Sequence, residues 1–126
     1  GKTGLGVYAD GMVEHDGQVG EVLAKLKELG LDQNTIVMYS TDNGAETFTW
    51  PDGRTTMFRG EKNTQWEGGY RVATRISWPG VIKPGSVNND IVSCLDFAET
   101  FLDIAGLPVP ADMQGRSLVP VMRGQT

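Results

Sequence analysis

The chain has 126 residues, of which 39% are hydrophobic and 21% are charged, and its formal net charge is −5. This length suits one domain, and the negative charge argues against nucleic acid or an anionic membrane as the main partner. No apolar run approaches the ~20 residues of a membrane span, and the single cysteine, Cys94, excludes an internal disulfide. We expect Cys94 to be a small buried hydrophobic residue.

The first expected element is a helix from about Val7 to Leu29, with Gly30 as the residue that ends it. Its apolar residues recur mostly at spacings of three or four, which predicts one buried face. His15 lies on this stripe, and we expect a hydrogen-bonded core histidine rather than a catalytic one. The stripe consists of Tyr8, Met12, His15, Val19, Val22, Leu23, Leu26 and Leu29.

A short apolar run from Thr35 to Ser40 follows, typical of a strand that is buried on both faces of a sheet. Asp42 and Asn43 come just beyond its carboxyl end, where ligands gather in α/β sheets. Their hard oxygen atoms suit Ca²⁺ or Mg²⁺. Gly44 is expected to adopt the positive φ that turns both side chains toward one point. Taken alone, these residues favour a purely local Asx-turn over a metal site.

A helix, a short loop and a buried strand in this order predict an α/β fold with a mostly parallel sheet. The next segment, residues 45–69, is long and irregular, and Trp50 and Trp66 are expected to pack it. Residues 71–78 resume an extended pattern that Pro79 and Gly80 close.

The last third of the chain is predicted to contain one more helix. Residues 87–94 read as a strand or an extended link, and a helix is expected from Asp96 to Ala105, with Gly106 as its terminator. Asp96 and Glu99 have the spacing of a capping box. A short turn is expected near residues 118–122.

The central segment carries the strings that identify a family. Thr41-Asp42-Asn43-Gly44, Phe58-Arg59-Gly60-Glu61-Lys62, Trp66-Glu67-Gly68-Gly69 and Arg71-Val72 together resemble the type I sulfatases, and arylsulfatases in particular. The resemblance covers almost the whole chain. It extends to Tyr8, Glu14-His15-Asp16, Val19-Gly20, Trp50-Pro51-Asp52-Gly53, Trp78-Pro79-Gly80, Asp96, Thr100 and Ala105-Gly106.

This resemblance implies part of an alkaline-phosphatase-like fold, with residues 1–126 as a single partial domain from the latter portion of a sulfatase catalytic domain. It implies an arylsulfatase-like hydrolase that acts on a small-molecule sulfate ester. Asp42 and Asn43 would bind a divalent cation, usually Ca²⁺ with Mg²⁺ as the alternative, and Lys62 would contact the sulfate and the leaving oxygen. Arg59 and Arg71 are expected to hold carboxylates such as Glu61 or Glu67.

The sequence departs from the family in its nucleophile. Sulfatases use a formylglycine made from a Cys/Ser-x-Pro-x-Arg motif, and Cys94 is followed by Leu95-Asp96-Phe97-Ala98 instead. We therefore expect the formylglycine upstream in longer members, and no turnover by this chain alone. Two alternatives stay open: a phosphoester or phosphonate hydrolase of the same superfamily, and a non-catalytic module that binds an anion, a cation or a partner. A fragment would expose apolar surface and self-associate.

Overall fold

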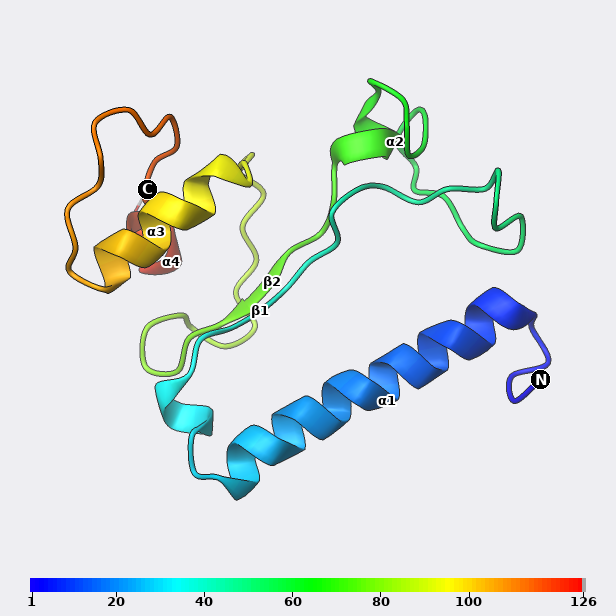
Figure 1. Cartoon of the computed structure of the whole chain (residues 1–126), viewed down its shortest axis with the longest axis horizontal. Coiled ribbons are helices and arrows are strands. Elements are labelled where there is room, and N and C mark those ends of the chain that lie inside the picture. Colours follow the sequence, from blue (N-terminus) through cyan, green and yellow to red (C-terminus); the bar gives the residue numbers. More distant parts are fainter. Residues whose placement is uncertain (126) are drawn as a thin grey trace. The chain divides into compact units, whose positions relative to one another are not determined.

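The structure is a computed structural model that describes residues 1–125. These residues divide into two compact units, the first spanning Gly1–Ile76 and the second beginning at Ser77. Figure 1 shows the elements of each unit along the chain. No helix among the described residues is both long enough and apolar enough to cross a membrane.

The first unit opens with helix α1, Val7–Glu28, within a residue of the predicted bounds. Gly30, at φ +66°, ends it as predicted: its N–H donates to the Lys27 carbonyl, and the Leu31 N–H donates to the Leu26 carbonyl. At the other end, Asp52 reaches in from the central loop and accepts a hydrogen bond of 3.0 Å from the Tyr8 N–H. A carboxylate at this terminus caps a free backbone donor and opposes the helix dipole.

The apolar stripe of α1 is not buried, contrary to the prediction. No residue of the helix is buried, and Met12, Val22 and Leu23 are 46%, 60% and 46% exposed. His15 is likewise exposed rather than part of a core, although its Nε2 lies 3.1 Å from the Tyr39 hydroxyl. The reason is size, because a helix of this length spans ~33 Å whereas a three-residue strand spans ~10 Å.

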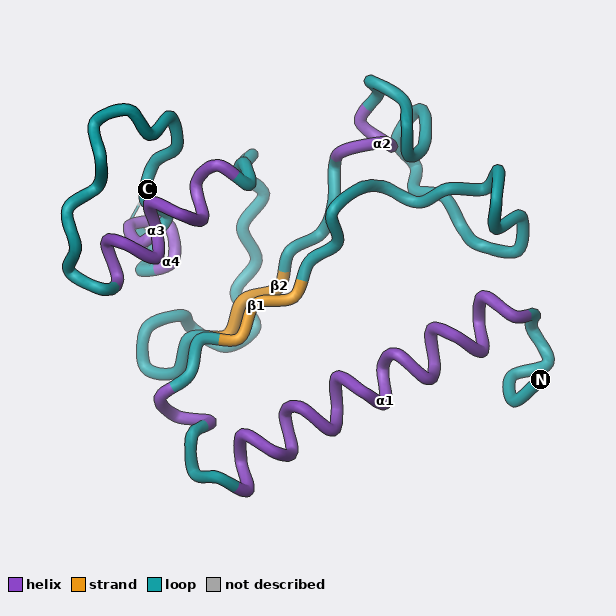
Figure 2. The backbone as a smooth tube through the Cα atoms, in the orientation of Figure 1, coloured by secondary structure: helices purple, strands orange, loops and turns teal. Residues whose placement is uncertain are grey.

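Two short strands form the only sheet among the described residues. The 3₁₀ turn η1, Asp32–Asn34, leads into β1, Val37–Tyr39, which pairs with β2, Arg75–Ser77. The strands run antiparallel in Figure 1, and Ser40 Oγ lies 3.0 Å from Thr74 Oγ1. The predicted parallel pairing is therefore wrong for this chain, since the connection in Figure 2 is a returning loop with only the short helix α2, Glu67–Tyr70. Parallel neighbours need a crossover instead.

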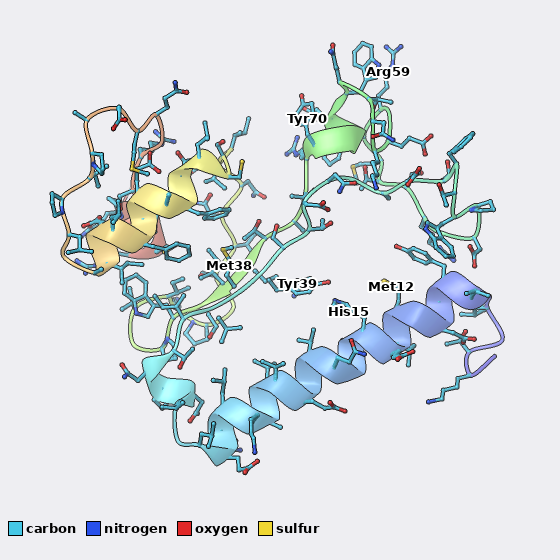
Figure 3. The ribbon with its side chains drawn as sticks, viewed as in Figure 1. Met12, His15, Met38, Tyr39, Arg59 and Tyr70 are labelled. Atoms are coloured by element: carbon cyan, nitrogen blue, oxygen red, sulfur yellow. The ribbon has the colours of Figure 1, made fainter. Side chains whose placement is uncertain are left out.

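Strand β1 is not buried on both faces as predicted. Met38 is 38% exposed and Tyr39 is 43% exposed, although Tyr39 points toward His15 of α1 in Figure 3. With one neighbouring strand among the described residues, this apolar three-residue strand stays partly open to water.

The second unit contains α3, Leu95–Ile104, and α4, Val119–Met122. Residues 87–94 contain no strand, which resolves that alternative in favour of an extended link. Gly106 ends α3 as predicted, at φ +67°. The predicted capping box of Asp96 and Glu99 does not form. Instead, the Ser93 N–H donates to Asp96 Oδ2 over 2.8 Å, and the Leu95 N–H donates to Ser93 Oγ.

Buried polar side chains of α3 hold the tail, residues 107–125. Asp96 accepts from the Arg116 N–H, Glu99 from the Gly115 N–H, and Thr100 from the Leu118 N–H. All three side chains are buried. Each accepts a hydrogen bond from a tail N–H that would be bonded to a backbone carbonyl in a helix or strand.

Cys94 is exposed, so the prediction of a buried cysteine is wrong. Every residue from 83 to 95 is exposed, so Cys94 lies in a continuous exposed stretch.

Candidate functional site

Two segments of the first unit are joined backbone to backbone. The Gly44 N–H donates to the Gly69 carbonyl over 2.8 Å, and the Lys62 N–H donates to the Ala45 carbonyl over 2.9 Å. Within the second segment, the Gly68 N–H donates to the Arg59 carbonyl over 2.7 Å. These bonds bring the loop that carries Lys62 against the turn that carries Asp42 and Asn43.

Four glycines make this close approach feasible, and we call them the glycine lock: Gly44, Gly60, Gly68 and Gly69. A Cβ on Gly44 would lie 1.8 Å from the Gly68 carbonyl oxygen, and one on Gly68 would lie 2.1 Å from that of Gly60. Gly60 also has φ +83°. Gly44 does not have the positive φ that was predicted; glycine is required there because the facing backbone leaves no room for a side chain.

Glu61 fastens the next part of the loop, a role that the sequence reasoning missed. Its Oε2 accepts hydrogen bonds of 2.7 Å from both the N–H and the hydroxyl of Thr47. The Thr47 N–H, and then its hydroxyl, hold the pKa of Glu61 below the ordinary value of 4.5. No short motif marks such a pair, because the two residues are fourteen positions apart.

The predicted ligand residues lie together on the turn after β1. Asp42 is exposed and Asn43 is half-buried, and Asn43 Nδ2 donates to Asp42 Oδ1. Among residues 1–125, no three His, Cys, Asp or Glu side chains cluster as a complete metal site would require. The turn therefore offers two oxygen-bearing side chains and not a full coordination shell.

The backbone of Lys62 is fixed by a hydrogen bond, and its side chain forms one long ion pair. Its N–H binds Ala45, three residues after Asp42. The Nζ atom lies 3.7 Å from Glu46 Oε2, and the lysine side chain is 43% exposed. At this distance and exposure the ion pair contributes little stability, so the ammonium group remains available to a ligand.

Aromatic rings and arginines stack around the lock. Arg71 pairs with Glu67 over 3.2 Å, as predicted, and its guanidinium lies 4.3 Å from the centre of the Phe58 ring. Arg59 does not hold a carboxylate as predicted; its Cζ lies 3.7 Å from the centre of the Trp66 ring.

The two tryptophans of the central segment are both exposed, 46% at Trp50 and 49% at Trp66, so neither is buried in the loop. For Trp66 the contacts are clear, because its Cβ lies 2.6 Å from where a Cβ on Gly60 would be. It therefore serves as a packing anchor of the loop.

Comparisons with known proteins find three kinds of match: a family model, curated relatives and solved structures. The family model described as Sulfatase matches residues 3–107. The chain is 38% identical to steryl-sulfatase of Mus musculus and 35% identical to arylsulfatase A of Homo sapiens, covering 98% of this chain and 21% and 24% of those proteins. It superimposes on the crystal structure of the PsFucS1 sulfatase from Pseudoalteromonas sp. with a TM-score of 0.81 and 35% identity, covering 93% of this chain and 25% of that one. The chain thus spans a quarter or less of the length of these relatives.

Proposed function

Since the chain belongs to the sulfatase family, we propose that it supplies the cation-binding turn and the sulfate-binding lysine of a sulfuric ester hydrolase. The observation that carries this proposal is the 2.9 Å hydrogen bond between the Lys62 N–H and the Ala45 carbonyl. It ties the part of the central segment that carries Lys62 to the turn of Asp42 and Asn43, which lies far from Lys62 in sequence.

The donor set fits a hard divalent cation. Asp42 offers carboxylate oxygens and Asn43 an amide oxygen, which are ligands that Ca²⁺ and Mg²⁺ prefer. A half-turn of the Asn43 amide would replace its nitrogen by its oxygen beside Asp42 Oδ1, so both residues could bind one ion. Ca²⁺ takes six to eight oxygen ligands, so these two residues would hold it together with others from outside the chain. When bound, the cation would neutralise negative charge on the sulfate.

Lys62 would act on the same anion from the loop side. An ammonium group is a compact charge with rotating donors, which suits an oxygen of a tetrahedral sulfate. As the ester S–O bond breaks, negative charge develops on the leaving oxygen. A cation held beside that oxygen stabilises the developing charge. The backbone bonds of the glycine lock keep the lysine in place before substrate arrives.

The nucleophile would come from another part of the polypeptide, because the chain contains no Cys/Ser-x-Pro-x-Arg string. We expect the isolated chain to release no product from aryl sulfates. Measurable, Lys62-dependent turnover by the purified chain would contradict this division of the site.

The proposal is tested by replacing Lys62 with alanine in a sulfatase that contains this chain. We expect kcat/KM for 4-nitrophenyl sulfate to fall about 10²–10³-fold, as on loss of an oxyanion donor. Lys83→Ala, which removes an exposed lysine of the second unit, is the matched control and should leave the rate unchanged. An unchanged rate for Lys62→Ala would remove this residue from the mechanism, and faster turnover of the matching phosphate ester would favour a phosphoester hydrolase.

A further inference from the structure

Arg59 presents a cation that the proposed chemistry at Lys62 does not use. Its guanidinium stacks on Trp66, 3.7 Å from the ring centre, and its side chain is exposed. Figure 3 shows Arg59 projecting outward from the loop that precedes α2. Stacking restricts the rotamers of a long side chain, so a ligand would find the guanidinium already oriented.

The carboxylates closest to Arg59 in sequence bind other residues. Glu61 accepts two hydrogen bonds from Thr47, and Glu67 pairs with Arg71. Across residues 1–125, no carboxylate lies within ion-pair distance of the Arg59 guanidinium. In a chain whose net charge is −5, this leaves a stacked guanidinium with its N–H donors open to a ligand.

Arg59 and Lys62 lie on the same fixed loop. The Arg59 carbonyl accepts from the Gly68 N–H, and the Lys62 N–H donates to the Ala45 carbonyl. Three residues of chain separate their Cα atoms by at most ~10 Å, and both side chains are long. The connection between the two cations is therefore short enough for one ligand with two anionic groups to contact both.

We propose that Arg59 binds a second anionic group, a sulfate or a carboxylate, on a ligand whose sulfate ester contacts Lys62. This rests on the function proposed above for Lys62. The planar guanidinium can donate two parallel hydrogen bonds to such a group, which a lysine cannot do. The site would thus prefer dianionic sulfate esters to monoanionic ones.

The test measures binding to the full chain and needs no turnover. Because Arg59 covers Trp66, a bound anion should change the emission of this tryptophan, which is isolated by replacing Trp50 and Trp78 with phenylalanine. The probes are phenyl sulfate and the disulfate esters of catechol, resorcinol and hydroquinone, which differ in the spacing of their anions. We expect at least one disulfate to bind about twofold to fivefold more tightly than phenyl sulfate, the range of an exposed ion pair.

Two substitutions separate the roles. Arg59→Gln should abolish the preference for the disulfate and leave the affinity for phenyl sulfate within about twofold, since only the second anion is affected. Arg54→Gln, another exposed arginine of the loop, is the matched control and should keep the preference. Circular dichroism verifies that each variant is folded. If Arg59→Gln unfolds, Arg59→Lys, which retains the charge, replaces it. Arg59→Lys should reduce the preference for the disulfate.

The outcomes are distinct for the two proposals. A parent chain that binds no disulfate more tightly than phenyl sulfate, including one that binds neither, overturns the role of Arg59. So does an Arg59 variant that weakens both ligands equally. Lys62→Ala with unchanged phenyl sulfate affinity overturns the function proposed for Lys62, whatever Arg59 does.

Discussion

At the scale of single residues, the chemistry of the site is visible in the sequence but its geometry is not. Asp42, Asn43 and Lys62 follow from donor type and from resemblance. The contacts that join them do not, because the bonds between Lys62 and Ala45 and between Glu61 and Thr47 link residues that no local pattern relates. Arg59 shows the same limit. It stacks on Trp66, whereas Glu61 and Glu67 bind other residues, and the sequence alone does not show which partner each side chain has.

Gly44→Ala tests whether the glycine lock sets the site. The added Cβ would overlap the Gly68 carbonyl, so the two segments must separate, at a cost of about 1–3 kcal/mol as for overpacked sites. We expect the amide of Lys62 to lose hydrogen-exchange protection and binding of phenyl sulfate to weaken.

The matched control for this substitution is Gly17→Ala in α1. A Cβ there meets nothing within 4 Å, and replacing an interior helical glycine should stabilise α1 by up to ~1 kcal/mol. If the Lys62 amide of folded Gly44→Ala were protected as in the parent chain, steric exclusion would not be the reason for glycine at this position.

At the scale of elements, helices were predictable and strand pairing was not. Periodicity and the terminating glycines Gly30 and Gly106 predicted α1 and α3 to within one or two residues, because both signals are local. The orientation of β1 against β2 depends on how a long irregular connection returns, which the alternation of apolar residues does not encode. The predicted capping box fails for a related reason, since Asp96 accepts hydrogen bonds from Ser93 and from the distant Arg116.

The contact between α3 and the tail should depend on pH. The Ser93 N–H, and then the Arg116 N–H and charge, hold the pKa of Asp96 below its ordinary value of 3.8, against the opposing effect of burial. A carboxyl whose folded pKa is depressed contributes stability above its unfolded pKa and loses it as pH falls through the folded value. We therefore expect the protection of the Arg116 amide, measured by NMR hydrogen exchange, to fall as pH decreases below about 4.

Asp96→Asn should remove most of that dependence, because the amide side chain does not titrate in this range. Asp112→Asn, at an exposed carboxylate of the tail, should leave the pH profile of the parent chain intact. A parent profile that is flat from pH 5 to pH 2, or one that Asp96→Asn leaves unaltered, would show that another group governs this contact.

At the scale of the whole molecule, the chain exposes far more surface than its mass predicts. Its accessible area is 9862 Å². A folded monomer of 13.7 kDa exposes about 6,600 Å². Leu118 and Val119 are the only buried hydrophobic residues among those described, whereas the apolar stripe of α1 is open. The sequence predicted that stripe correctly but placed it in a core, because periodicity shows which face is apolar and not what covers it.

This surplus of apolar surface predicts self-association of the isolated chain, since exposed stripes of this kind pair or aggregate in water at micromolar concentrations. Leu23→Lys should weaken association because it places a charge in the stripe, where Leu23 is 46% exposed. Ala24→Lys adds the same charge on the opposite side of the helix and should not. Analytical ultracentrifugation from about 1 to 100 μM, with ANS fluorescence, distinguishes them. A parent chain that stays monomeric and binds no ANS would instead support an independently folded module.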